Sequence, residues 1–142
     1  MSDHLKLSNQ VCFPIYNLSK EVINHYRPIL KELDLTYSQY LVMLVLWEKG
    51  EQNVSEIGAD LNLDSGTLTP LLKRLEQKKL IERNRKKSDE RVVSISLTKE
   101  GIKKQEQAEG IPSKIQESLN VTTEELQDLK RIIDQIITQI NK

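Results

Sequence analysis

The most constraining feature of this sequence is a change of hydrophobic period near its middle. Between residues 36 and 77, apolar residues recur every three or four positions, which is typical of amphipathic helices. Between residues 80 and 97, they alternate with polar residues, which is typical of half-buried strands. The pattern predicts a group of short helices that is followed directly by a β-hairpin.

Three helices are expected directly before the hairpin, within residues 36–77. The first, over residues 36–48, is apolar on almost every side and is therefore expected at the centre of the core. The second follows Asn53, which has the spacing of a capping box with Glu56, and it ends near residue 62. The third has one leucine face at the i, i+3, i+4, i+7 spacing, made of Leu68, Leu71, Leu72 and Leu75.

The start of the third helix is open to more than one interpretation. Asp64, Ser65 and Thr67 are all candidate N-caps. Pro70 fits the first turn if Thr67 is the cap, because the first N–H groups of a helix have no partner within it.

The hairpin is predicted as strands over residues 80–83 and 91–97, joined by a polar loop over residues 84–90. A short helix, a turn, a second helix and a hairpin are the order of a winged helix-turn-helix, here over residues 36–97. In that fold the second helix enters the major groove of DNA. The expected fold class is therefore mainly α with a small β-hairpin wing.

The outward face of the third helix suits contact with nucleic acid. Thr69 and Lys73 lie one turn apart on it, and Ser65 and Thr67 lie at its N-terminal end. Their hydroxyl and ammonium groups can reach base edges or phosphates. An ordinary solvated helix would also fit this face, so the hairpin has to decide between the two interpretations.

Charge is concentrated in the same region. The whole chain is neutral, with 21 basic and 21 acidic residues, but residues 65–91 hold nine basic and four acidic ones. This asymmetry favours a surface that faces a polyanion, although a charged hairpin beside a solvated helix would also produce it.

Four cations gather at the expected tip of the hairpin, where packing needs none. They are Arg85, Lys86, Lys87 and Arg91. Asp89 is close enough in sequence to orient the guanidinium of Arg91, and an arginine held in this way can enter a minor groove. The expected DNA-binding residues are Ser65, Thr67, Thr69, Lys73, Arg74, Arg85, Lys86, Lys87, Asp89 and Arg91.

Both ends of the chain predict helices with uncovered apolar faces. Residues 8–33 carry two adjacent apolar stripes, and residues 98–142 predict helices that Gly110 and Pro112 interrupt. Hydrophobic residues make up only 37% of the chain, so the core is thin or shared with a partner. We expect a homodimer in which the two ends meet as dimerisation helices. The alternative is that both ends fold back onto their own core.

The sequence also narrows the class of protein. No apolar run approaches the ~18 residues of a membrane helix, and no signal peptide is visible, so a cytoplasmic protein without a membrane partner is expected. One cysteine, Cys12, and two histidines exclude an internal disulfide framework and argue against a metal site. No cofactor is expected.

Cys12 lies near the start of the helix expected over residues 8–33, where Pro14 removes a helical hydrogen bond. Either the helix kinks near Cys12 or it begins there, beside unsatisfied N–H groups that favour a thiolate. Tyr16 and Tyr26 share one helical stripe with Cys12, and buried phenols seek hydrogen-bond partners. Without further information, a free cysteine on such a face is more often a small buried hydrophobe.

Together, these segments resemble the MarR family of dimeric winged-helix repressors. The resemblance rests on residues 64–76, 89–91 and 95–98, and it covers almost the whole chain. It extends to residues 10–13, Gln-Val-Cys-Phe, which are similar to the pattern of OhrR-type organic-hydroperoxide sensors and related staphylococcal thiol sensors.

The resemblance implies a homodimer on an inverted repeat of double-stranded DNA, with the helix after Asp64 in the major groove and Arg91 in the minor groove. It also implies that Cys12 is the peroxide-reactive thiol, with Tyr16 and Tyr26 as phenol partners within or across the dimer. The expected protein is a transcriptional repressor. It senses organic hydroperoxide or oxidative stress through oxidation of Cys12 and then releases DNA.

Two departures from the family pattern bear on the thiol. Pro14 stands where relatives usually carry an aliphatic or small residue, and the chain has no second cysteine. Oxidation can therefore end as a sulfenic acid, as a mixed disulfide with a small thiol, or as a Cys12 to Cys12 bridge between subunits.

Other functions remain to be weighed against this one. The main alternative is a MarR-type repressor that responds to a small phenolic or lipophilic ligand, with Cys12 only structural. A peroxide-reducing enzyme is not favoured, because the chain has no resolving thiol and Arg27 is far from Cys12 in sequence. A purely structural protein would not need four cations at a hairpin tip.

Overall fold

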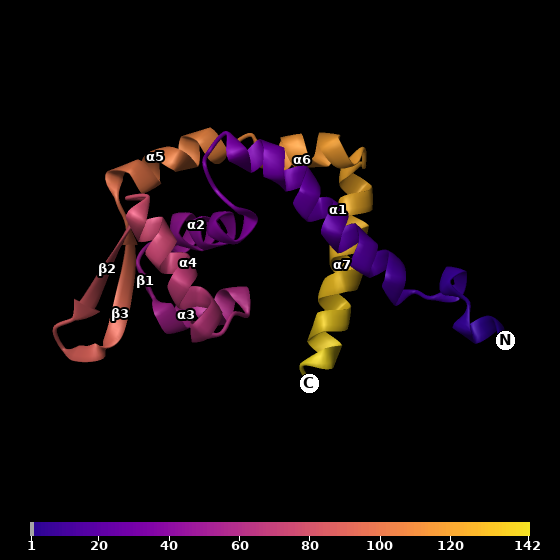
Figure 1. The fold of residues 1–142 in the computed structure, drawn as a ribbon, viewed down its shortest axis with the longest axis horizontal. Helices are drawn as coiled ribbons and strands as arrows, with labels where there is room; N and C mark the ends of the chain where they lie inside the picture. The colour runs from indigo at the N-terminus through magenta and orange to yellow at the C-terminus, as the bar shows by residue number, and fades with distance from the viewer. Residues whose placement is uncertain (1) are drawn as a thin grey trace. The chain divides into compact units, whose positions relative to one another are not determined.

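The computed structural model describes residues 2–142, apart from the side chain of Glu90. The chain forms two compact units (Figure 1): Arg27–Glu109 is one, and Met1–Tyr26 together with Gly110–Lys142 is the other. The secondary structure confirms the expected fold class, mainly helical with a small antiparallel sheet. Within the described residues, no helix is long and apolar enough to cross a membrane.

The unit Arg27–Glu109 contains the predicted succession of helices and strands. Its elements are α2 (Tyr37–Lys49), β1 (Gln52–Asn53), α3 (Val54–Leu61), α4 (Ser65–Gln77), β2 (Ile81–Lys86), β3 (Asp89–Leu97) and α5 (Lys99–Ala108). The C-terminal end of α1 (Cys12–Lys31) also lies in this unit. The three helices expected before the hairpin are confirmed.

Local hydrogen bonds fix the starts of α2 and α3. The Thr36 hydroxyl accepts a hydrogen bond from the Gln39 backbone N–H, and the Gln39 side chain accepts one from the Thr36 backbone N–H. Asn53 and Glu56 form the predicted capping box at α3 in the same reciprocal way. α3 ends at Asn62, which adopts a left-handed conformation with φ 54°.

The structure decides between the three candidate caps of α4. Asp64 is the N-cap, because its carboxylate accepts a hydrogen bond from the Thr67 backbone N–H at 2.7 Å. Hydrogen bonds from Thr67 hold the pKa of Asp64 below its usual range. Asp64 is therefore confirmed among the three candidate caps, and Pro70 lies inside the helix, where it cannot donate to the carbonyl of Gly66.

The hairpin, or wing, has longer strands and a tighter turn than the sequence pattern predicts. β2 continues to Lys86 and β3 begins at Asp89, so the loop predicted over residues 84–90 is wrong, and Lys87 and Ser88 form the turn. Successive residues near the end of β2 are all exposed. A strand that is exposed on both faces shows no alternation of apolar and polar residues, which explains the error.

β3 is the central strand of the sheet, in the order β1-β3-β2. The pairing register shifts near the tip of the wing: Arg85 pairs with Val93, whereas Lys86 pairs with Asp89. Residues 90–92 of β3 therefore bulge between these two pairs, with Arg91 in the middle. Such bulges redirect side chains, which is consistent with a special role for Arg91.

The core of this unit joins α4 to the sheet and to α2. Its fully buried side chains include Leu30, Met43, Leu46, Ile57, Leu68, Leu72, Leu75, Ile81 and Ile95. The Trp47 ring N–H donates to the Gly101 carbonyl at 2.9 Å. At Gly101 a Cβ atom would lie only 2.2 Å from the Leu80 carbonyl oxygen, so glycine permits the close approach of α5 to the residue before β2.

The second unit is helical. The short helices η1 (Asp3–Leu5) and η2 (Leu7–Asn9) precede α1, and α6 (Ile111–Leu119) and α7 (Thr123–Ile140) complete the unit. α1 begins at Cys12, so Pro14 lies in its first turn, and the second of the two predicted starts is confirmed. Gly110 and Pro112 mark the predicted interruption, at which α6 begins as a separate helix.

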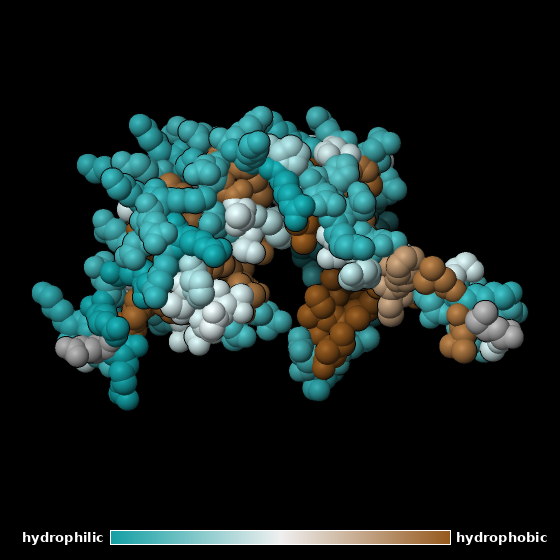
Figure 2. Space-filling view, in the orientation of Figure 1, coloured by the Kyte–Doolittle hydropathy of each residue, from teal (hydrophilic) through white to brown (hydrophobic). Residues whose placement is uncertain are grey.

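Much of the apolar surface of this unit is uncovered in the single chain. On α7 the exposed fractions lie between 40% and 72% for Leu129, Ile132, Ile133, Ile136, Ile137 and Ile140. Figure 2 shows brown, hydrophobic side chains along this helix. At the N-terminal end of the unit, Leu5, Leu7, Val11 and Ile15 are also exposed.

Candidate functional site

The polar face of α4 is displayed by the burial of its apolar face. Leu68, Leu71, Leu72 and Leu75 all point into the core. Ser65, Thr67, Lys73 and Arg74 are consequently exposed, and Thr69 is half-buried. The five α4 residues predicted to contact DNA therefore lie on the surface of one rigid helix.

The tip of the wing carries the second predicted group. Arg85, Lys86 and Lys87 are exposed. The Asp89 carboxylate accepts hydrogen bonds from the Arg91 backbone N–H at 3.0 Å and from Arg91 Nε at 3.3 Å. The Arg91 side chain is nevertheless 92% exposed, so the predicted contact is confirmed and orients a guanidinium that remains open to solvent.

A groove connects the helix with the wing. It has a volume of about 270 Å³, and Thr69 of α4, Arg83 of β2 and Arg91 of β3 line it together with the first turn of α3. The groove therefore brings two guanidinium groups and a hydroxyl from distant parts of the sequence into one surface. Cations and hydroxyl groups that line one groove are suited to contacts with phosphates and base edges.

Two residues of this groove that could contact DNA, Arg83 and Ser55, were absent from the predicted set. Arg83 lies within the basic segment 65–91, so its charge was a usable signal, but a predicted strand gave no reason to choose it. Ser55 follows the α3 cap by two residues, and only the packing of α3 beside the wing reveals its position. Both are exposed or half-buried.

The thiol lies in the other unit. Cys12 is the first residue of α1 and is exposed in the single chain. Tyr16, one turn later, is also exposed, and Lys20 Nζ lies 4.4 Å from the centroid of its ring. An oxidant in solvent can therefore reach Cys12 in this chain.

Tyr26 is half-buried and lies on the same helix, fourteen residues after Cys12. At a rise of about 1.5 Å per residue, the two residues are about 21 Å apart along the helix axis. A contact between the Cys12 thiol and the Tyr26 phenol would therefore need Tyr26 of a second copy of the chain.

His25 lies on α1 as well. Its Nδ1 contacts the Ser118 hydroxyl of α6, and its Nε2 lies 3.8 Å from the Glu21 carboxylate. Among residues 2–142, no group of three or more histidine, cysteine, aspartate or glutamate side chains could hold a metal ion.

Comparison with known proteins places the chain among transcriptional regulators. The family described as "Transcriptional regulator SarA/Rot" matches residues 24–108. The chain is 46% identical over 136 residues to the organic hydroperoxide resistance transcriptional regulator of Bacillus subtilis, which covers 96% of this chain and 90% of that protein.

Solved structures of regulators on DNA have the same fold. Reduced AbfR bound to DNA matches with a TM-score of 0.75 and 38% identity, over 99% of this chain and all of that chain. AbfR has also been solved in an overoxidised form bound to DNA, with a TM-score of 0.78, 38% identity and 97% of each chain covered. A mutant of Escherichia coli MarR complexed with operator DNA matches with a TM-score of 0.77 and 25% identity, over 89% of this chain and 92% of that chain.

Proposed function

Because the chain belongs to the MarR family of winged-helix transcriptional regulators, we propose that it is a dimeric regulator that binds an inverted-repeat DNA site and releases it when Cys12 is oxidised. The groove that joins Thr69 to Arg83 and Arg91 carries this proposal. It combines a helix of major-groove size with a cationic wing, as DNA recognition by this fold requires.

In this proposal the two predicted groups of residues have different tasks. α4 enters the major groove, and the wing lies along the neighbouring backbone, where Arg91 enters the minor groove. Asp89 orients Arg91 without touching DNA. The contacts to bases and phosphates come from Ser65, Thr67, Thr69, Lys73, Arg74, Arg85, Lys86 and Lys87, to which the structure adds Ser55 and Arg83 as candidates.

The dimer follows from the uncovered apolar faces. We propose that residues 8–33 and 98–142 are the dimerisation arms and that residues 36–97 form the DNA-binding region. The isoleucine stripe of α7 would be buried against the second copy, since contiguous apolar surface of this kind rarely stays in water.

The sensing step is the reaction of the Cys12 thiolate with an organic hydroperoxide. The sulfur attacks the distal peroxide oxygen, the O–O bond breaks, and the products are a sulfenic acid and an alcohol. A small thiol can then displace water from the sulfenic acid to form a mixed disulfide. Tyr16 and the Tyr26 of a second copy are the proposed phenol neighbours of the sulfur.

The free energies involved indicate which oxidation product of Cys12 releases DNA. To move a regulator from 99% to 1% DNA-competent requires about 5.5 kcal/mol. The loss of one charged hydrogen bond supplies about 1.5–3 kcal/mol, so one sulfenic acid does not suffice, whereas two symmetric sites together can reach the threshold. A bulky mixed disulfide that displaces a tyrosine can reach the threshold. The structure of overoxidised AbfR bound to DNA supports this distinction, because overoxidation alone did not prevent that protein from binding DNA.

The relatives are regulators, and we propose no catalytic turnover for this chain. Its one cysteine leaves it without a second thiol to resolve an oxidised Cys12. A regulator that binds chromosomal DNA would act in the cytoplasm.

The test uses fluorescence anisotropy with DNA that carries the inverted repeat upstream of the gene for this protein. The wild-type protein should bind it, lose affinity partly with cumene hydroperoxide, and lose it fully with the hydroperoxide plus a small thiol. Cys12→Ser preserves size and a hydrogen bond, so it should bind equally well and ignore both treatments. If Cys12→Ser is still released, a small-molecule effector replaces Cys12 oxidation as the proposed signal.

A further inference from the structure

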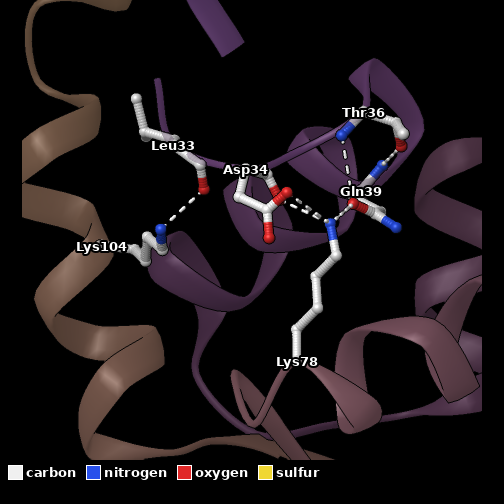
Figure 3. A network of polar contacts seen from close by, with 6 residues as sticks. All are labelled: Leu33, Asp34, Thr36, Gln39, Lys78 and Lys104. Carbon is white, nitrogen blue, oxygen red and sulfur yellow. Dashed lines mark hydrogen bonds and ion pairs between the residues drawn. The ribbon is translucent and has the colours of Figure 1, made fainter. Parts of the chain in front are cut away.

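The C-terminal end of α1 is held by two lysines from other helices of the unit Arg27–Glu109 (Figure 3). α1 ends in a turn in which Leu35 N–H donates to the Leu30 carbonyl at 3.1 Å and Asp34 is left-handed, with φ 55°. Two backbone carbonyls in this turn, those of Leu33 and Asp34, accept hydrogen bonds from lysine ammonium groups. Lys104 Nζ donates to the Leu33 carbonyl at 2.6 Å, and Lys78 Nζ donates to the Asp34 carbonyl at 2.5 Å.

Lys78 makes two further contacts at this site. Its ammonium donates to Gln39 Oε1 at 2.9 Å and lies 3.7 Å from the Asp34 carboxylate. Gln39 is only 3% exposed, and the same Oε1 accepts from the Thr36 N–H that starts α2. Three acceptors thus surround an ammonium that has three hydrogens to donate, so the position of Nζ is fully specified.

These contacts join three helices at one point. Lys78 is the C-cap residue of α4, Asp34 follows the last turn of α1, and Gln39 belongs to the first turn of α2. α1 is the helix that begins at Cys12, and α4 is the helix assigned to the major groove. The segment that leads from α1 into α2 therefore meets the end of α4 at Lys78.

We propose that Lys78, Asp34 and Gln39 form a latch that transmits a displacement of α1 to α4. The inference rests on the proposed function, since it concerns how oxidation at Cys12 changes DNA affinity. α1 is one helix from Cys12 to Lys31, but Pro28 inside it removes one helical hydrogen bond. The contacts that hold the turn after α1 therefore decide how a shift at the start of the helix reaches α4. Hydrogen bonds to a charged donor depend strongly on direction, whereas apolar packing alone would let α1 and α4 slip. Lys78 is thus a positioning residue that does not touch DNA.

The experiment compares two methionine variants of the full-length protein. Lys78→Met keeps the aliphatic stem and removes the ammonium. Lys79→Met removes the same charge from the next residue, whose side chain is exposed. The measured quantity is the ratio of the DNA dissociation constants after and before treatment with cumene hydroperoxide plus a small thiol.

The latch predicts that Lys78→Met reduces this ratio at least fivefold relative to Lys79→Met. The two reduced proteins should bind DNA within threefold of each other. Lys78→Arg retains a charged donor and should keep the ratio within twofold of the wild type. A merely structural role would weaken binding equally in both states and leave the ratio unchanged.

The outcomes separate the latch from the proposed function. If the wild type is released and both methionine variants have the same ratio, the latch is wrong and the sensing proposal stands. If the oxidised wild type is not released, the sensing proposal fails and the latch fails with it. Should Lys78→Met not fold, Asp34→Gly serves instead, because glycine favours the left-handed conformation at this position. It removes the carboxylate and should reduce the ratio about twofold, and an unchanged ratio would overturn the latch.

Discussion

The two units of this chain use regular apolar stripes in opposite ways. In Arg27–Glu109, the leucine stripe of α4 is a core, since Leu68, Leu72 and Leu75 are at most 1% exposed. In the terminal unit, the stripe of α7 is equally regular, yet Ile133 and Ile137 remain 42% and 50% exposed. The same periodicity therefore builds an interior in one unit and an exposed apolar face in the other.

In the proposed function, this difference separates the support of the DNA-binding surface from its control. The side chains of α4 and the wing are mounted on a unit that has its own core. The thiol belongs to the terminal unit, whose apolar faces are uncovered in the single chain. On that proposal, oxidation in the terminal unit would change DNA binding without requiring that the core of Arg27–Glu109 unfold.

The largest expected effect comes from charging the interface. Ile133→Asp combined with Ile137→Asp should abolish the dimer and give an unfolded or aggregated chain, because each change would bury a carboxylate without a partner. Light scattering and circular dichroism measure the outcome. Gln135→Asp combined with Gln139→Asp adds the same charges to exposed positions of α7 and should leave a folded dimer. A folded dimer of the isoleucine variant would show that α7 does not form the interface.

A second, smaller effect is expected in the core of the other unit. Leu72→Ala should lower the free energy of unfolding by about 2–5 kcal/mol, because it leaves a cavity beneath α4. Denaturant titration measures this loss. The exposed neighbour Lys73, changed to alanine, should alter stability by no more than about 0.5 kcal/mol. If Leu72→Ala costs less than the surface change, the leucine stripe is not the core of the unit.

The sequence predicts well those features that depend on near neighbours. The capping box of Asn53 with Glu56 and the leucine face of α4 are complete within one or two helical turns, so both could be recognised directly. The contact of Asp89 with Arg91 spans only two residues and was also predicted. The apolar stripe of α7 was also recognised from its spacing, but the stripes of residues 8–33 left open whether the chain would cover it.

Features that depend on pairing across the chain could not be predicted in this way. β1 has only two residues and exists because Gln52 and Asn53 pair with β3. The end of β2 is exposed on both faces, so it carries no period that distinguishes it from a loop. Arg83 joins Arg91 and Thr69 in one groove only after the wing packs beside α3 and α4. The Lys78 latch likewise depends on contacts across about forty positions of sequence.

The next prediction separates binding from stability in the DNA-binding unit. Arg91→Ala should weaken DNA binding by about 1–3 kcal/mol, most strongly on sites with an A·T-rich flank, because such flanks narrow the minor groove. Thermal stability should not change, since the side chain is exposed. Lys103→Ala removes a charge from an exposed position of α5 outside the groove and should have little effect on binding. An equal loss on every flank would make Arg91 a plain phosphate contact.

The smallest expected effect concerns one helix cap in each unit. The Asp64 carboxylate accepts from Thr67 N–H at the start of α4, and the Glu125 carboxylate accepts from Thr122 N–H at the start of α7. These hydrogen bonds hold the pKa of both carboxyl groups below their usual range. A lowered folded-state pKa contributes stability that is fully present above the unfolded value of about 4, and that is lost as the pH falls through the folded value.

Asp64→Asn and Glu125→Gln keep an oxygen acceptor at each cap but cannot titrate. Each variant should therefore melt slightly below the wild type at neutral pH, and the difference should shrink towards zero below about pH 4, where the wild-type carboxyl groups also become neutral. Both groups are solvent-exposed, so the difference is small and needs calorimetry across a pH series. Because both carboxylates accept a backbone N–H at the start of a helix, Asp64 as the N-cap and Glu125 from the first turn, a pH-dependent difference in both units would show that a titratable cap stabilises the start of α7, despite its uncovered face, as well as that of α4. A difference that stays constant with pH would show that the two carboxylates do not titrate differently on folding.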